Sequence, residues 1–377
     1  LTILTNTNKP FLKRNNFRLT NKALLPNGGG KDSIVSSELL KDIGLEFSWV
    51  TVGLTNYRKN VINASDIRSY LNISYIQYGK VPNDYKTYSG HIPYTLYTSC
   101  LICLVAGLTN MKYVVYSNEK SANFPNLTIT EDGREIDINH QYTKSYEFEE
   151  RYHYFLKTYV NKELEYFSIL RPLYEIQIAS VFSNFTKYHK VFVSCNWGKW
   201  CGKCSKCAFI YLSLYPYIDN KKLKSIIGND MLNDKKLLKT YLELTGHKNY
   251  KPFECVGTLD ENQLIMNLAI NKSNSIGEDL YIINYYKKSI PNIKYNPKLL
   301  TEYNNENKIP IGLKRDVKQS IQKYIQGSSE KKCVDTTEHF TNPSKNYENI
   351  SNIQPKYVKY IIFLITVFIT YYIIYRI

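Results

Sequence analysis

The stretch Leu24-Leu25-Pro26-Asn27-Gly28-Gly29-Gly30-Lys31-Asp32-Ser33 joins an apolar segment to the start of a predicted helix. Three consecutive glycines let backbone N–H groups approach an anion, because no Cβ atom blocks the way. The helix dipole adds its positive end near Asp32, and Lys31 supplies a cation that we expect to be mobile. A glycine turn without a ligand is the alternative. We predict a loop for the phosphates of ATP, formed by Gly28, Gly29, Gly30, Lys31, Asp32 and Ser33.

The spacing of these glycines differs from two common nucleotide-binding motifs, G-x-x-x-x-G-K-[ST] and G-x-G-x-x-G. It is similar to the S-G-G-x-D-S loop of the PP-loop ATP pyrophosphatases. Those enzymes split ATP between the α and β phosphates, and they typically activate a carboxylate or carbonyl oxygen as an adenylate. The resemblance implies an α/β fold of the PP-loop type, which is also called adenine nucleotide alpha hydrolase-like.

The pattern of apolar residues around the loop predicts the same fold class. Helical spacing over 34–43 precedes a strand over 45–52, and an apolar helix over 95–108 leads into a strand over 111–116. This alternation favours a parallel sheet with helices on both faces, and ligands bind such sheets at the carboxyl ends of the strands.

We divide the chain into four parts. The expected parts are a PP-loop ATP-binding domain over 1–190, a helical substrate subdomain with a four-cysteine metal site over 191–300, a polar linker over 301–356 and a membrane anchor over 357–377. The anchor is predicted because 360–375 is almost uninterruptedly apolar and has Lys356, Lys359 and Arg376 at its ends. A buried C-terminal helix is the alternative. We expect the anchor to leave the catalytic domain in the cytoplasm.

The formal net charge of +16 suits an anionic partner. Part of this charge is discounted, because the chain is also rich in Asn, Ile and Tyr, a bias that AT-rich coding can produce. A nucleotide sugar or an acidic membrane surface fits the charge, and we expect no nucleic-acid partner.

Four of the eight cysteines form a second motif, Cys195-Asn-Trp-Gly-Lys-Trp-Cys201-Gly-Lys-Cys204-Ser-Lys-Cys207. Four thiolates bind zinc tightly and leave no open position for water, so the predicted zinc is structural. Lysines in and around the motif would offset its negative charge. Packing of Trp197 and Trp200 around the motif would be consistent with this structural role, and a place in the ordinary core is the alternative. An iron–sulfur cluster and unligated cysteines are the alternatives. Cys100 and Cys103 lie in the apolar helix and are expected in the core.

Six blocks carry a family resemblance. They are Gly90-His91-Ile-Pro-Tyr, Ser117-Asn-Glu-Lys-Ser-Ala-Asn123, Asn139-His-Gln-Tyr-Thr-Lys-Ser145, Arg171-Pro-Leu173, Trp200-Cys-Gly-Lys-Cys-Ser-Lys-Cys207 and Lys251-Pro-Phe-Glu-Cys-Val-Gly257. In this order they resemble the UDP-N-acetyl-α-D-muramoyl-L-alanyl-L-glutamate epimerase family, over about two-thirds of the chain.

The resemblance implies an ATP- and Mg²⁺-dependent enzyme that inverts the terminal L-Glu of UDP-MurNAc-L-Ala-L-Glu to D-Glu. Its substrate would be this UDP-linked muramoyl dipeptide, a precursor of peptidoglycan. Forming an acyl-adenylate would cancel the carboxylate charge and make the neighbouring C–H acidic enough for a base to remove the proton. The alternatives are another PP-loop enzyme, such as one of the queuosine pathway, and a non-catalytic membrane-tethered nucleotide-binding relative.

The same resemblance implies roles for further residues. Ser117, Asn118 and Glu119 join the nucleotide site, where Glu119 is a candidate Mg²⁺ ligand. His140 is the first candidate for acid/base catalysis, Lys144 would bind a carboxylate or phosphate, and Cys255 would serve the opposite face of the substrate. Structural roles are the alternatives for His140 and Cys255. Two further candidates are His91, as a nucleotide contact or helix cap, and Arg171, as an anion clamp or a surface ion pair.

Overall fold

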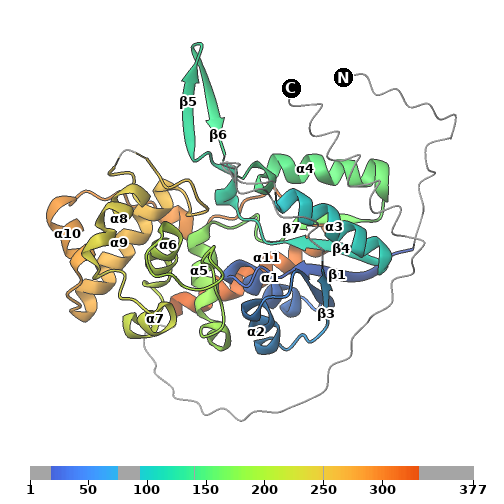
Figure 1. The fold of residues 1–377 in the computed structure, drawn as a ribbon, viewed down its shortest axis with the longest axis horizontal. Helices are drawn as coiled ribbons and strands as arrows, with labels where there is room; N and C mark the ends of the chain where they lie inside the picture. The colour runs from blue at the N-terminus through green and yellow to red at the C-terminus, as the bar shows by residue number, and fades with distance from the viewer. Residues whose placement is uncertain (1–17, 75–93, 140, 249, 331–377) are drawn as a thin grey trace, which may run out of the picture.

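The computed structural model describes residues 18–74, 94–139, 141–248 and 250–330 (Figure 1). Within these residues the main sheet has five parallel strands in the order β3-β2-β1-β4-β7. The strands of the main sheet are β1 (Thr20–Pro26), β2 (Phe47–Val52), β3 (Tyr70–Ile73), β4 (Met111–Tyr116) and β7 (Glu165–Ser168). The predicted α/β class with a parallel sheet is therefore confirmed.

Helices follow the strands and then form a separate half of the molecule (Figure 1). Those near the sheet are α1 (Lys31–Asp42), α2 (Asn56–Ala64), α3 (Tyr94–Leu108), α4 (Tyr146–Phe155) and α5 (Glu175–Ser183). Those that follow are α6 (Ser205–Leu214), α7 (Asn220–Ile227), α8 (Leu238–Leu244), α9 (Leu259–Ile276), α10 (Tyr281–Ser289) and α11 (Ile311–Glu330). The elements described between residues 205 and 300 are all helical.

The sheet is buried on both faces, because neighbouring residues of a strand point in opposite directions. Leu24 and Val114 pack with α3 and α4 on one face. Leu25 and Val115 pack with α1 and α5 on the other face. Strands buried on both sides need continuous apolar runs, which explains why β1, β2 and β4 lack a polar face. Helices cover both faces, as predicted.

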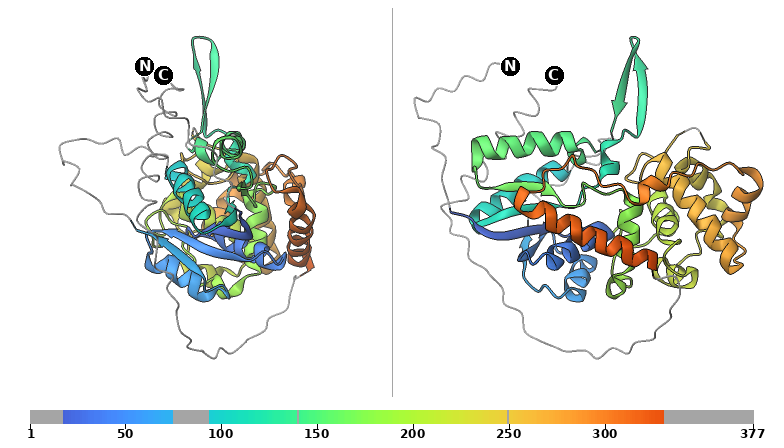
Figure 2. Two further views of the ribbon diagram at one scale, coloured as in Figure 1. Left: turned by 90° about the vertical axis from the view of Figure 1, so that its right-hand side faces the viewer. Right: turned by 180° about the vertical axis from the view of Figure 1, so that it is seen from behind.

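A hairpin of β5 (Leu127–Glu131) and β6 (Arg134–Ile138) projects from the body of the molecule (Figures 1 and 2). Asp132 and Gly133 both have positive φ angles, 51° and 75°, which suit the tight turn of a two-residue hairpin. The hairpin begins and ends beside Asn126 and Asn139, so its base lies next to the site described below.

The prediction of a polar linker over 301–356 is wrong for residues 311–330. Residues Ile311–Glu330 form helix α11, which lies along α1 and α5 (Figure 2, right). Its apolar residues Val317 and Ile321 are fully buried at helical spacing, so the segment belongs to the core. The exposed face is occupied by Lys314, Lys318, Gln319, Gln322 and Lys323, which made the segment look like a linker.

No helix among the described residues is both long and apolar enough to cross a bilayer. The predicted anchor over 357–377 lies outside those residues, so it stays a prediction.

A buried histidine between α5 and α6 gives a pH-dependent stability. His189 is 1% exposed, and burial lowers its pKa to about 4, with a further contribution from nearby Lys222. Unfolded protein takes up this proton below pH 6.5, whereas folded protein does so only near pH 4, so stability falls as the pH drops through this window. We expect the titration of His189 to lower the free energy of unfolding by about 3 kcal/mol between pH 7 and pH 4.

Urea unfolding of the wild type and of His189→Asn over this pH range measures the effect. The wild type should lose more free energy of unfolding than the variant does. Equal pH dependence in the two proteins would exclude His189 as the cause.

Candidate functional site

The site lies where the strand order of the sheet reverses, at the carboxyl ends of β1 and β4. The glycine loop, residues 27–30, follows β1, and Ser117, Asn118 and Glu119 follow β4 directly. Successive crossovers run to opposite sides at this point, and open parallel sheets generally bind ligands there. The hydroxyl of Ser36 on α1 donates to Ser117 Oγ at 2.7 Å, so the helix that follows the glycine loop contacts the loop after β4. The predicted nucleotide residues are thus brought together.

The three glycines differ in what surrounds them. Gly29 has φ of +79°, and a Cβ there would lie 2.3 Å from the ring of Tyr57. A Cβ on Gly30 would lie 3.0 Å from Ser194 Oγ. Gly28 is exposed, and a Cβ there would meet nothing within 4 Å. Two of the glycines therefore serve the packing of the protein itself, and Gly28 is the open position of the loop.

Lys31 is not the mobile cation that the sequence predicts. Its side chain is 0% exposed, and its ammonium group forms ion pairs with Asp32 and Glu175. Burial acts to lower the pKa of Lys31, but the charges of Asp32 and Glu175 outweigh it and raise the pKa overall. The cation is charged and fixed, because two carboxylates hold it in place.

Glu175 was missed in the sequence. It is the first residue of α5 and is 1% exposed. Burial raises its pKa, although Lys31 and Lys206 act against this. Lys206 Nζ lies 3.9 Å from Glu175 Oε1 and also donates to the carbonyl oxygen of Cys255. The available signal was an acidic residue two positions after the Arg-Pro-Leu block.

Lys144 and Cys255 meet at the side of this cluster. Lys144 Nζ donates to Cys255 Sγ at 3.4 Å, and the Cys255 thiol reaches Gln141 Oε1 at 3.6 Å. Burial acts to lower the pKa of Lys144, but Cys255 and Glu119 raise it overall. Burial raises the pKa of Glu119, and the neighbouring charge of Asp32 adds to this effect. A cysteine and a lysine 111 residues apart are therefore in direct contact.

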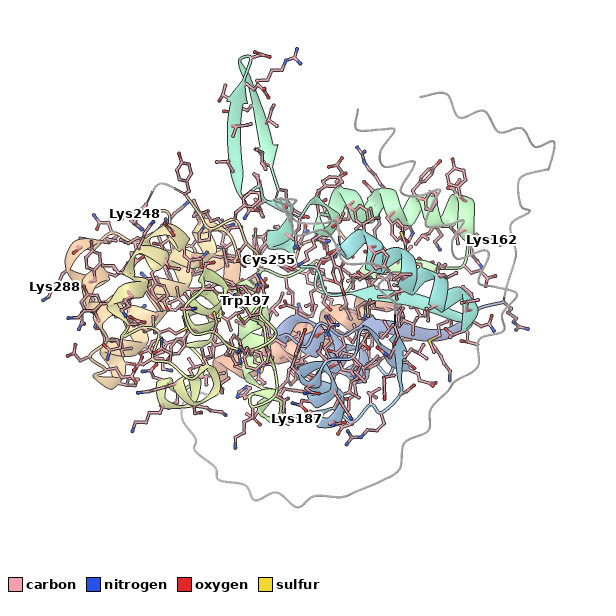
Figure 3. All side chains as sticks on the ribbon, viewed as in Figure 1. Lys162, Lys187, Trp197, Lys248, Cys255 and Lys288 are labelled. Atoms are coloured by element: carbon pink, nitrogen blue, oxygen red, sulfur yellow. The ribbon has the colours of Figure 1, made fainter. Side chains whose placement is uncertain are left out.

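A hollow with about 310 Å³ of empty space, part of it open to solvent, adjoins this pair. It is lined by residues from the loop after β4, the base of the hairpin and the segment 251–257. Those with polar or charged side chains are Glu119, Ser121, Asn126, Asn139, Gln141, Lys144, Lys251, Glu254 and Cys255. Figure 3 shows Cys255 near the middle of the molecule, between the sheet and the helical half.

The charged residues form one continuous cluster between the glycine loop and this hollow. Electrostatic contacts run from Asp32 to Glu119 and Lys144, and from these to Cys255. The cluster contains three lysines and three carboxylates: Lys31, Lys144, Lys206, Asp32, Glu119 and Glu175. Groups of opposite formal charge therefore lie next to one another throughout this cluster.

Arg171 is neither a surface ion pair nor an open anion clamp. It is 0% exposed and forms an ion pair with Glu149 at 2.9 Å. Its guanidinium also donates to the carbonyl oxygens of Glu119 and Lys144, both at 2.8 Å. Arg171 therefore holds the backbone of two site residues and has no side left for a ligand.

His140 and His91 lie outside the described residues, so the structure places neither of them. Their predicted roles stay predictions.

The four cysteines of the second motif converge, as predicted. All four Sγ atoms lie within 4.8 Å of one another, with 4.0 Å between Cys195 and Cys204 and 3.7 Å between Cys201 and Cys207. Disulfide sulfurs lie about 2.05 Å apart. Tetrahedral zinc with Zn–S bonds of about 2.3 Å spaces its sulfurs by about 3.8 Å. This group could hold a single metal ion such as zinc.

Two details around the cysteines differ from the prediction. Trp197 is 76% exposed, so only Trp200 packs inward, where its ring contacts Phe192. Lys206 turns away from the thiols toward Glu175. Cys103 is buried in the core on α3 and Cys100 is half-buried beside it, as expected.

The cysteine loop, residues 193–207, contacts both the glycine loop and the segment 251–257. Val193 N donates to Gly29 O at 2.9 Å, and Lys31 N donates to Ser194 Oγ at 3.3 Å. On the other side, Asn196 Nδ2 donates to Glu254 Oε2 at 2.9 Å. The loop thereby fixes the glycine loop and the segment that carries Cys255.

Two family models match the chain. The MurL N-terminal domain matches residues 3–169, and the MurL C-terminal domain matches residues 181–298. The chain belongs to the MurL family. The N-terminal domain includes the glycine loop, Glu119 and Lys144, whereas the C-terminal domain includes the four cysteines and Cys255.

Curated relatives give the same family. The chain is 32% identical over 270 residues to the UDP-N-acetyl-alpha-D-muramoyl-L-alanyl-L-glutamate epimerase of Xanthomonas oryzae, a match that covers 67% of this chain and 57% of the relative. It is 35% identical to proteins of the same name from Micromonospora sp. and Salinispora tropica, with 64% and 65% of this chain and 55% of each relative covered. The chain thus spans little more than half the length of these relatives. No solved structure matches it.

Proposed function

We propose that this chain inverts the terminal L-Glu of UDP-MurNAc-L-Ala-L-Glu to D-Glu in an ATP-dependent reaction. The names of the MurL relatives support the epimerase role. The observation that carries the proposal is the charged cluster that joins the glycine loop to the Lys144–Cys255 pair. A substrate that is joined to ATP at its carboxylate and gives up a proton at the next carbon would extend along this cluster, from the glycine loop to Cys255.

The proposed reaction begins with an adenylation. The α-carboxylate of the glutamate attacks the α-phosphorus of ATP, the bond to the β-phosphate breaks and pyrophosphate leaves. The resulting acyl-adenylate no longer carries the carboxylate charge, so its α-proton is removed more easily. A base takes this proton, an acid returns one on the opposite face, and water releases AMP.

We assign the nucleotide to the carboxyl ends of β1 and β4, in a fold of the PP-loop type. Gly28 leaves the loop open, and the helix cap Gly30 has no side chain to accept from the first amide groups of α1. Ser33, Ser117 and Asn118 lie at the same end of the sheet. Asp32, Glu119 and Glu175 offer the carboxylate oxygens that Mg²⁺ prefers. Bound Mg²⁺ would neutralise the phosphates, and Lys31 would stabilise charge on the departing pyrophosphate.

We assign proton transfer to Cys255 on one face of the α-carbon. Lys144 donates a hydrogen bond to Cys255 Sγ, and it is also placed to bind a carboxylate or phosphate. His140 is proposed for the opposite face, because it is adjacent in the chain to Asn139 and Gln141, which line the hollow.

We further propose that the four cysteines hold structural zinc, because four thiolates leave no position for a substrate. Purified protein should contain about one zinc per chain, and Cys204→Ser should lose most of it, because one of four ligands is removed. Elemental analysis measures this. Cys100→Ser, outside the cluster, is the matched control and should retain the metal. A brown preparation containing iron would identify an iron–sulfur cluster instead.

The domain arrangement is also a proposal. Residues 1–190 would form the ATP-binding domain and 191–300 the substrate subdomain. An anchor over 357–377 would attach the protein to a membrane with its catalytic part in the cytoplasm.

Hydrogen exchange at the glutamate α-carbon tests the proposed function. The protein is incubated in D₂O with UDP-MurNAc-L-Ala-L-Glu, Mg²⁺ and ATP. We expect AMP release, and deuterium at the α-carbon only when ATP is present. Unrelated amino acids should release no AMP, and the D-Glu epimer tests the reverse direction. Labelling without ATP would exclude the adenylate route, and AMP release with a different carboxylate alone would identify another PP-loop enzyme.

A further inference from the structure

Lys251 is a cation of the hollow that the proposed reaction does not use. It lies in the segment that leads to Cys255 and lines the same hollow. Among the described residues Lys251 forms no hydrogen bond and no ion pair, whereas Lys144 contacts Cys255 and Lys206 contacts both Glu175 and the Cys255 carbonyl. An unpaired, half-buried ammonium beside a hollow provides an anion-binding position.

The acids around Lys251 form no ion pair with it among the described residues, and Oε1 of Glu261 has no hydrogen-bond partner there. Glu261 attracts Lys251 most strongly, but its Oε2 accepts from Ser121 Oγ at 2.8 Å and from Thr258 N at 2.7 Å. Glu254 accepts from Asn196. Burial lowers the pKa of Lys251, as expected for a cation without a close counter-ion. A negatively charged group in the hollow would supply this counter-ion.

The order of residues along the site indicates which group this is. Asp32, in the first turn of α1 after the glycine loop, interacts electrostatically with Glu119 and Lys144, and these interact with Cys255. Lys251 lines the same hollow as Cys255, and this lining includes no residue of the glycine loop. A glutamate with its α-carboxylate toward the nucleotide and its α-carbon at Cys255 would extend its side chain toward Lys251.

We propose that Lys251 binds the γ-carboxylate of the glutamate that is inverted, and that it thereby makes the site specific for glutamate over glutamine. This inference rests on the proposed function, because it takes the glutamyl peptide as the substrate. Lys251 is a specificity-determining residue that acts on binding and does not take part in the bond changes.

Binding and turnover are measured with UDP-MurNAc-L-Ala-L-Glu and with its L-Gln analogue, which lacks only the γ-charge. By calorimetry without ATP, the wild type should bind the Glu compound about 10- to 100-fold more tightly than the Gln compound. Lys251→Met should lose this preference by weakening only the Glu compound, and KM should rise similarly with kcat little changed. Lys251→Arg should retain most of the preference. Lys248→Met, an exposed lysine three residues earlier, is the matched control (Figure 3).

The outcomes separate the two proposals. If Lys251→Met binds both compounds more weakly by the same factor, the lysine binds another anion, such as the diphosphate, and the inference is overturned. It is also overturned if the wild type shows no preference or if Lys251→Met keeps it. A wild type that binds with the expected preference but never labels the α-carbon supports Lys251 and contradicts the proposed reaction.

Discussion

Replacing Lys31 with methionine is expected to lower AMP formation about 10²- to 10³-fold, the effect of removing one preorganised charge-stabilising group. Lys31 is held by Asp32 and Glu175 at the start of α1, where pyrophosphate would depart. A fixed cation needs no rearrangement when negative charge develops, so its loss should act on the adenylation step. Deuterium exchange at the α-carbon should fall in proportion, because exchange depends on the adenylate.

Lys41→Met is the matched control for this change. Lys41 lies near the end of the same helix, is 41% exposed and forms an ion pair with Asp66. Removing an exposed pair has little effect, so this variant should retain the wild-type rate. The double variant Lys31→Met/Glu175→Gln should recover stability, because it removes a carboxylate left unpaired, but it should not recover AMP formation. A Lys31→Met rate within about threefold of the Lys41→Met rate would contradict the assigned role.

Local patterns were sufficient to predict the architecture. The expected strand over 111–116 is β4, and the helix expected over 95–108 is α3, one residue longer at its start. Continuous apolar runs and glycines at turns can be recognised in short segments of sequence. A parallel sheet that is buried on both faces requires such apolar runs. The convergence of the four cysteines was also predictable, because the last three are spaced by three residues.

Partners distant in the chain were not predictable in the same way. Nothing near Lys31 in the sequence indicates that Glu175, 144 residues later, neutralises it. The same holds for Arg171, whose glutamate partner lies on α4 and whose other acceptors include backbone carbonyls. A charged residue in a motif suggests a ligand-binding role. Its burial and its ion-pair partners decide whether the charge is available to a ligand. Lys251 is the opposite case, because only the structure shows that its charge lacks a partner among the described residues.

Replacing Arg171 with methionine is expected to destabilise the protein by about 3–5 kcal/mol, because the change leaves the carboxylate of Glu149 buried without its counter-ion. The carbonyl oxygens of Glu119 and Lys144 would also lose donors in the interior, where unpaired polar groups are costly. Urea unfolding followed by circular dichroism measures the loss as a lower midpoint.

The nearby pair Arg151–Glu147 provides the control, because it joins the same residue types on the surface of α4. Arg151 is 73% exposed, so Arg151→Met should change stability by less than about 0.5 kcal/mol. Arg171→Met/Glu149→Gln should recover part of the loss, since no buried charge then remains. A small effect of Arg171→Met, equal to that of Arg151→Met, would mean that water reaches Glu149 and that Arg171 does not hold the backbone of the site. Burial is the difference between the two arginines on which this expectation depends.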